Sequence, residues 1–210
     1  MSQAVVKKPA LAISSDDEHA LLPSITPTVD VVLGGNVWKV MSFPTGINRT
    51  LLNRLNNCLD AFLSWHSKAY MIRFDISLYD SLPHNHKISK FRSIVVKALQ
   101  SHYQSTVAFG WVREQNSVAD KCHYHCFVQL NGHKANSTNT TFNIVQHALA
   151  LVVDINAYFP DNCAYMIKRN SLKSRQAALF RLSYLAKNAS KNGKPNAAKG
   201  YYFSRITHKR

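Results

Sequence analysis

Two segments rich in aromatic and β-branched residues constrain the fold of this chain most strongly. They cover residues 106–114 and 122–130, and a polar connection separates them. Segments of this composition that lie close in sequence are typical of paired antiparallel strands. The sequence therefore predicts a β-hairpin near the middle of the chain, which must bury at least one face of a sheet.

The remaining periodic segments predict an α+β fold. Apolar residues spaced three and four apart predict helices, and alternating or short apolar runs predict strands. The helices are expected at 48–68, 89–103, 141–153 and 174–188, and the further strands at 69–78, 162–168 and 201–207. This order favours a central, mainly antiparallel sheet of about five strands with helices packed on one side, in a ferredoxin-like or split β-α-β arrangement.

The N-terminal region differs in composition from the rest. Prolines at positions 9, 23 and 27 interrupt any periodic pattern, which predicts a flexible arm over residues 1–30. Residues 31–44 could form a small strand pair or a docked extension. We therefore expect an N-terminal arm or extension over residues 1–45 and one domain over residues 46–210, a length that suits a single core.

Positive charge is concentrated near the C-terminus. The formal net charge is +15, and residues 166–210 contain twelve Lys or Arg and no Asp or Glu. Such a surface can bind phosphates by counterion release, although a merely solvated basic face is the alternative. The candidate phosphate contacts are Lys168, Arg169, Lys173, Arg175 and Arg181.

The sequence disfavours membrane insertion and secretion. There is no apolar run long enough to span a bilayer, and the first twenty residues have no hydrophobic signal-peptide core. The four cysteines form no C-x-x-C pair, which fits reduced thiols. We expect an intracellular, cytoplasmic protein.

The strand predicted at 122–130 carries two histidines on one face. Side chains of a strand alternate between faces, so His123 and His125 point to one side and Tyr124 to the other. Two neutral imidazoles at this spacing can bind one divalent cation. Ordinary half-exposed strand histidines are the alternative. A structural zinc site that includes Cys122 and Cys126 is disfavoured, because both thiols point away from the imidazoles.

A third metal ligand is needed, and Glu114 is the candidate. It ends the preceding strand, so a hairpin brings it back beside His123 or His125; a solvated carboxylate at the hairpin end is the alternative. Asp75, late in the first strand, is a second possible acidic contributor or a strand-end acceptor. A rival pair, His84 and His86, lies in a Pro-Asn loop and is interpreted as surface or DNA-contacting.

The last predicted helix carries a tyrosine outside its apolar stripe. The stripe consists of Ala178, Leu179, Leu182, Leu185 and Ala186. Tyr184 falls nearly opposite its centre, with Lys187 three residues on and Arg181 one turn back. A phenol has an ordinary pKa near 10 and is a poor nucleophile unless a neighbouring charge or acceptor assists it. Lys187 can supply that charge, whereas an exposed tyrosine that stacks on a base or is inert is the alternative.

Together these motifs resemble the HUH (His-hydrophobe-His) endonucleases of the single-tyrosine type. The segments Met71-Ile72-Arg73-Phe74-Asp75, Gly110-Trp111-Val112-Arg113-Glu114, His123-Tyr124-His125 and Ser183-Tyr184-Leu185-Ala186-Lys187 look most like inovirus-type replication proteins of phages and integrated elements. The hydrophobe is a tyrosine here, which is a mild departure from the pattern. The resemblance covers residues 69–207.

The resemblance implies a DNA-nicking and joining enzyme that initiates rolling-circle replication in the cytoplasm of a bacterial host. It implies that His123, His125 and Glu114 hold Mg²⁺ or Mn²⁺ and that Tyr184, assisted by Lys187, attacks the scissile phosphate to leave a 5′-phosphotyrosine link. Single-stranded or origin DNA would be the substrate. No Gly-Lys-Ser/Thr loop is present, so unwinding would need a host helicase, and a host polymerase would extend the free 3′ end.

Other readings stay open at this point. The same site could serve a transposase or a mobilisation protein, and a non-catalytic basic DNA-binding protein is the main alternative. The aromatic residues Tyr201, Tyr202 and Phe203, which lie near Lys199 and Arg205, could stack on bases or could simply be a buried final strand.

Overall fold

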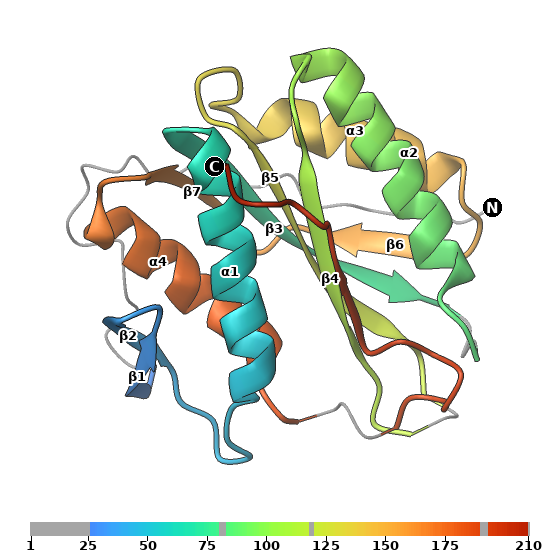
Figure 1. Cartoon of the computed structure of the whole chain (residues 1–210). Coiled ribbons are helices and arrows are strands. Elements are labelled where there is room, and N and C mark those ends of the chain that lie inside the picture. Colours follow the sequence, from blue (N-terminus) through green and yellow to red (C-terminus); the bar gives the residue numbers. More distant parts are fainter. Residues whose placement is uncertain (1–25, 80–82, 118–119, 190–192, 210) are drawn as a thin grey trace.

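A central antiparallel sheet organises the chain (Figure 1). The computed structural model describes residues 26–79, 83–117, 120–189 and 193–209. The strands are β1 (Thr28–Leu33), β2 (Asn36–Met41), β3 (Lys68–Leu78), β4 (Ala108–Glu114), β5 (His123–Asn131), β6 (Ile155–Tyr158), β7 (Ala164–Lys168) and β8 (Tyr201–Phe203). The helices are α1 (Arg49–Trp65), α2 (His86–Tyr103), α3 (Thr138–Ala150) and α4 (Leu172–Ser183), followed by a 3₁₀ turn, η1 (Tyr184–Ala186).

The main sheet has the strand order β6-β3-β5-β4-β8, and β7 also pairs with β3. Both β6 and β7 lie along the same edge of β3, because β6 pairs with Asp75–Leu78 and β7 with Lys68–Ile72. Six strands therefore occupy five positions. The predicted α+β class and the mainly antiparallel sheet of about five strands are confirmed.

The prediction that helices cover only one side of the sheet is wrong. One hydrophobic core lies between the sheet and helices α2 and α3, and a second lies on the opposite face beneath α1 and α4. The physical reason is that β3 and β5 are apolar on both faces at one end of the sheet. Met71 and Phe127, which share the face of the predicted histidine pair, are fully buried in the second core.

Helix α1 begins where the sequence provides a cap. The Asn48 side chain accepts a hydrogen bond from the Leu51 amide at 2.9 Å, which satisfies one free N–H of the first turn. The leucine-rich stripe of this helix, whose three-and-four spacing predicted a helix at 48–68, is buried against the sheet and α4. Asn48 also contacts the segment that carries the site, because its backbone N–H donates to the carbonyl of Ala186 at 2.7 Å.

The segment at 31–44 forms a strand pair, one of the two forms expected for it. Strands β1 and β2 are joined by a turn at Gly34 and Gly35, both with positive φ. Trp38 of β2 is 2% exposed, and the Met41 amide donates to the buried hydroxyl of Ser183 at 3.0 Å. The hairpin thus packs against α4. Residues 1–25 of the flexible arm expected over residues 1–30 lie outside the described residues, whereas residues 28–30 belong to β1, so the expectation of a flexible segment is wrong for them.

Three elements differ most from the sequence prediction, while the bounds of several others shift by a few residues. Strand β6 was not predicted, since its four residues are too short to show a period. The helix predicted at 174–188 ends at Ser183, and Tyr184 begins the 3₁₀ turn. The last strand is shorter than the predicted 201–207. Within the described part of the chain, none of the helices is both long and apolar enough to cross a bilayer.

Candidate active site on the α1/α4 face of the sheet

The register of three strands brings the predicted site residues onto one face of the sheet. His125 of β5 lies opposite Asp75 of β3 on one side and opposite Val112 of β4 on the other. Glu114 lies opposite His123, as the predicted hairpin requires. Residues directly opposite one another in an antiparallel pair point to the same face, so both imidazoles and both carboxylates share the face covered by α1 and α4.

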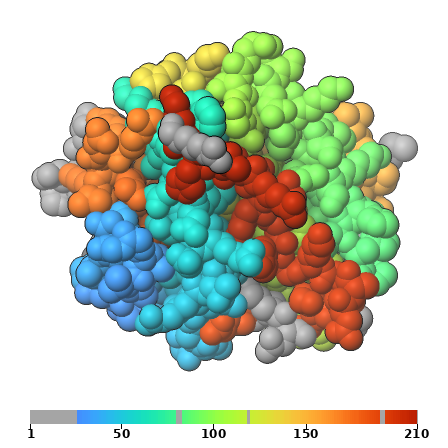
Figure 2. Space-filling model, in the orientation of Figure 1, coloured from blue at the N-terminus to red at the C-terminus, as the bar shows by residue number. Residues whose placement is uncertain are grey.

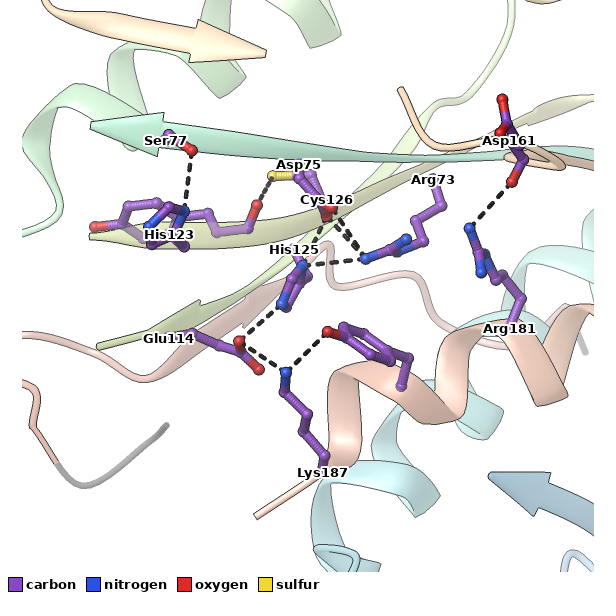
Figure 3. A network of polar contacts seen from close by, with 12 residues as sticks. Arg73, Asp75, Ser77, Glu114, His123, His125, Cys126, Asp161, Arg181 and Lys187 are labelled. Atoms are coloured by element: carbon purple, nitrogen blue, oxygen red, sulfur yellow. Dashed lines mark hydrogen bonds and ion pairs between the residues drawn. The ribbon is translucent and has the colours of Figure 1, made fainter. Parts of the chain in front are cut away.

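His125 lies between two carboxylates (Figure 3). Its Nδ1 atom is 2.7 Å from Oδ1 of Asp75, and its Nε2 atom is 2.9 Å from Oε2 of Glu114. The second contact has the distance of an ion pair but not the angles of a hydrogen bond, since Nε2 is buried without a hydrogen-bond partner among the described residues. His125 is 7% exposed.

The charges of this group support one another. Burial lowers the pKa of His125, but the carboxylates of Asp75 and Glu114 outweigh burial and leave that pKa raised. Burial raises the pKa values of both carboxyl groups, and the interaction with His125 outweighs it, so both pKa values are lowered. The imidazole and the two carboxylates therefore favour each other's charged forms, and a metal ion that bound Nε2 would have to replace its proton.

Tyr184 lies beside His125, although α4 ends one residue before it. The two rings are edge to face, with centroids 5.0 Å apart. The guanidinium of Arg73 lies over the phenol ring at 4.9 Å, and Phe43 contacts the ring from another side. The tyrosine is half-buried and packed against the sheet, and so it differs from the outward-facing side chain that the helical wheel predicted.

Lys187 links the tyrosine to the carboxylate. Its Nζ atom donates a hydrogen bond to the Tyr184 hydroxyl at 2.9 Å and lies 3.1 Å from Oε2 of Glu114. Burial lowers the pKa of Lys187, but the contacts with Tyr184 and Glu114 outweigh burial and leave the pKa raised. The ammonium group therefore stays charged next to the phenol oxygen.

His123 is held apart from this network. It is exposed, and its Nδ1 atom is 3.0 Å from the hydroxyl of Ser77 (Figure 3). Across the described ranges, no three His, Cys, Asp or Glu side chains form a group that could hold a metal ion. A pocket of about 330 Å³ is lined by both His123 and Glu114 at the end of the hairpin.

The chemistry of these donors nevertheless fits a divalent cation. Oε1 of Glu114 and Nε2 of His125 are both buried without a hydrogen-bond partner in the described part of the chain. Buried polar atoms without a hydrogen-bond partner are costly unless a water molecule or an ion satisfies them. A carboxylate and imidazoles together suit Mn²⁺, and carboxylate suits Mg²⁺. Both unsatisfied atoms belong to residues that the sequence marked as metal ligands.

The five predicted phosphate contacts differ in environment. Lys168 and Lys173 are exposed. Arg169 donates to the carbonyls of Leu63 and Ser64 at the end of α1, and Arg175 pairs with Asp60. Arg181 donates to the carbonyl of Asp161 at 3.2 Å (Figure 3). The cations that lie over the Tyr184 ring are Arg73 and Lys187, and not the expected Arg181.

Arg73 is the site residue that the sequence interpretation did not assign a role. It is 5% exposed, and its Nη2 atom lies 3.0 Å from Oδ1 of Asp75 and 3.2 Å from Nδ1 of His125. The available signal was an Arg-x-Asp pair inside an otherwise apolar strand. On a strand, residues two apart share a face, so the pair could have been placed on the histidine face.

The two cysteines of the disfavoured zinc site lie on the opposite face of the sheet from the histidines. Cys122 and Cys126 are buried in the core beneath α2 and α3, and Cys122 contacts Nη2 of Arg113 at 2.8 Å. The rival histidines, His84 and His86, stack on each other with ring centroids 4.0 Å apart at the start of α2. Neither pair contributes to the site around His125.

Comparison with known proteins adds one family. The sequence matches the YagK/YfjJ C-terminal domain over residues 35–200, from the turn of the first hairpin to the residue before β8. No curated protein and no solved structure matches the chain. The matched range includes Asp75, Glu114, His125, Tyr184 and Lys187.

Proposed function

The chain belongs to the YagK/YfjJ C-terminal domain family, and for this member we propose metal-dependent nicking and joining of single-stranded DNA with Tyr184 as the nucleophile. The observation that carries the proposal is one continuous set of contacts. It runs from the Tyr184 hydroxyl through Lys187 and Glu114 to His125, with distances of 2.9, 3.1 and 2.9 Å. A phenol and a cation-binding pair must lie this close to act on one phosphate.

The first role of the protein is to present the phenol oxygen. Lys187 donates to that oxygen and keeps its own positive charge, so it stabilises negative charge on the oxygen as the proton leaves. Arg73 and Phe43 restrain the ring from two sides. The nucleophile is thereby held in one orientation, which lowers the entropic part of the barrier.

The proposed reaction exchanges one phosphodiester bond for another. Oη of Tyr184 forms a bond to phosphorus, the bond from phosphorus to the 3′ oxygen breaks, and the leaving oxygen takes up a proton while the phenol loses one. The products are a 5′-phosphotyrosine link and a free 3′-hydroxyl. No oxidant or nucleotide cofactor is consumed, and reversal of the same step joins the strands.

Glu114, His125 and His123 are the residues that would hold a divalent cation, Mg²⁺ or Mn²⁺. Such a cation supplies Lewis acidity to a phosphate oxygen. Asp75 contacts Nδ1 of His125 and so orients the ring, which leaves Nε2 as the atom that would bind the cation. His123 shares the pocket at the hairpin end with Glu114, and so it can approach from the exposed side.

The setting that we propose is initiation of rolling-circle replication from origin DNA in the cytoplasm of a bacterial cell, with a host helicase and polymerase as partners. A transposase or mobilisation protein would use the same chemistry on a different DNA. A non-catalytic basic DNA-binding protein would use only the cationic surface. An assay for the covalent adduct separates the DNA-binding protein from the enzyme.

The test detects the covalent intermediate. A random-sequence pool of single-stranded DNA, labelled at the 3′ end, is incubated with the protein and Mn²⁺ and resolved on a denaturing protein gel. The 3′ label is chosen because the protein retains the downstream fragment through its 5′ phosphate. We expect a labelled adduct with the wild type and none with Tyr184→Phe. Lys187→Met should reduce the adduct about 100-fold, the usual loss when one charge-stabilising donor is removed.

The matched control is Tyr158→Phe, which removes the hydroxyl of a half-exposed tyrosine on β6. Its adduct should equal that of the wild type. An adduct that survives Tyr184→Phe would overturn the proposal, as would tight DNA binding by the wild type without any adduct in Mn²⁺ or Mg²⁺.

A further inference from the structure

A groove runs over the C-terminal strand, on the surface between α1 and α2. It has a volume of about 1030 Å³ and is lined by residues of both helices, by residues 106 and 107, and by residues 194 and 198–206. In Figure 2 the C-terminal segment, coloured red, crosses the face of the molecule between α1 in cyan and α2 in green. Strand β8, at the floor of the groove, is the last strand of the sheet order.

The charge of the groove is of one sign. Its cationic lining residues are Arg54 of α1 and Lys194, Lys199 and Arg205 of the C-terminal segment. None of the described residues that line it is acidic. Lys199 and Arg205 are exposed. A groove with this lining attracts a polyanion and can contact successive backbone phosphates.

Aromatic rings lie among these cations. Tyr201 and Phe203 point to the same face of β8 and stack on each other, with centroids 5.4 Å apart and an interplanar angle of 25°. Both side chains are only half-buried. Arg54 lies 5.3 Å from the centre of the Tyr201 ring. Partly exposed aromatic rings among cations are the usual platform for stacking the bases of a single strand.

The groove leads towards the candidate active site. Tyr201 lies opposite Val112, and Val112 lies opposite His125, so the tyrosine and the histidine are two strands apart on the same face. Two strand spacings correspond to about 10 Å. A smaller pocket of about 300 Å³ is lined by Tyr201, Val112 and Asn48. The backbone N–H of Asn48 donates a hydrogen bond to the carbonyl of Ala186, the residue before Lys187.

We infer that this groove, which we name the β8 groove after its floor, binds single-stranded nucleic acid and guides it to Tyr184. The inference rests on the proposed function, since the bound strand is the one that Tyr184 would attack. A single strand is favoured over a duplex because only unpaired bases offer a free face on which an aromatic ring can stack. An anionic membrane would satisfy the cations, but it offers nothing for the paired rings to stack on.

The test measures binding separately from cleavage. A fluorescein-labelled oligothymidylate is titrated with the Tyr184→Phe protein in the presence of a chelator, and anisotropy is recorded over a series of salt concentrations. The test variant adds Lys199→Ala and Arg205→Ala. We expect binding about 25-fold weaker near 0.1 M salt, and a salt slope smaller by about 1.4, because two phosphate contacts are lost.

The matched control is Lys90→Ala with Lys97→Ala in the same background. It removes the same charge from exposed positions of α2 that do not line the groove. We expect its affinity and salt slope to stay close to those of the Tyr184→Phe parent. Phe203→Leu serves as a second arm, in which stacking is lost while an apolar side chain is kept, and the affinity should fall severalfold at unchanged slope.

Three outcomes would overturn the inference. The first is that the groove variants (Lys199→Ala with Arg205→Ala) and the control variants weaken binding equally. The second is that duplex DNA binds as tightly as the oligothymidylate. The third is that the protein binds vesicles of anionic phospholipid and does not bind the oligothymidylate. Failure of the proposed function looks different. In that case the groove pair still weakens oligothymidylate binding, but the wild type forms no covalent adduct.

Discussion

At the scale of single residues, the most unusual feature is a set of buried charges that compensate one another. Arg73 and His125 are almost fully buried, and each contacts the carboxylate of Asp75. Removing one partner of such a set leaves the others desolvated without compensation, which costs more than an exposed ion pair contributes. Asp75 is therefore expected to support both the fold and the orientation of His125.

The Asp75→Asn variant should show this in its pH dependence. Burial raises the pKa of Asp75, but His125 and Arg73 outweigh burial and lower it. A carboxyl group whose pKa is lower in the folded chain stabilises the fold above its unfolded pKa, and that contribution is lost as the pH falls through its folded pKa. We expect the variant to lose about 2 kcal/mol of unfolding free energy near neutral pH. The loss should shrink as the pH falls below about 4.

Urea unfolding with a chelator, measured over a series of pH values, checks this. Asp30→Asn is the control, because Asp30 forms an exposed pair with Lys39 and its removal should cost less than about 1 kcal/mol. A difference between wild type and Asp75→Asn that stays constant down to acidic pH would contradict the assignment.

At the scale of elements, Gly110 of strand β4 allows the sheet to extend to β8. Gly110 lies opposite Phe127 of β5 and Phe203 of β8, and the two rings meet over it with centroids 5.8 Å apart. A Cβ atom at this position would clash with the Phe127 ring and lie 2.7 Å from the Phe203 ring. The missing side chain thus allows β8 to dock and to form the floor of the β8 groove.

Gly110→Ala should therefore destabilise the protein by overpacking. The expected cost is about 1–3 kcal/mol, measured as a lower midpoint of thermal unfolding. Gly200→Ala is the matched control, since its Cβ atom would meet only the Lys194 side chain at 3.7 Å, an ordinary contact. Equal unfolding midpoints for Gly110→Ala and the wild type would show that the rings can move apart without cost.

At the scale of the whole molecule, the sheet separates two environments. The face beneath α2 and α3 is a core that includes Cys122, Cys126 and Cys163, whereas the face beneath α1 and α4 combines a core, which includes Cys58, with the charged site. All four cysteines are free and buried. Burial raises the pKa of Cys58 to about 12 and that of Cys163 to about 11.

The folded protein should accordingly be almost inert to a thiol reagent. The thiolate is the reactive form, and a raised pKa removes it at neutral pH. We expect very slow reaction with Ellman's reagent in the folded state and reaction of four thiols per chain in denaturant. Glutathione under the same conditions provides the reference rate. Rapid reaction of one full equivalent of thiol per chain in the folded state would contradict the burial of the cysteines.

The sequence by itself determined the features that depend on local periodicity. The hairpin of β4 and β5 follows from two adjacent strand-forming segments, and its alternation places Glu114, His123 and His125 on one face. The leucine stripe of α1 follows in the same way from helical spacing. These predictions needed only the repeat of a strand or a helix, together with the short connection that pairs neighbouring strands.

Only the tertiary structure decided which distant elements meet. The contact of Lys187 with Glu114, the place of Arg73 beside His125, and the alignment of Tyr201 with His125 across β4 join segments far apart in the chain. The second core beneath α1 and α4 and the short strand β6 belong to the same group. Strand order and the choice of covered face result from the packing of the whole chain, and no local period encodes them.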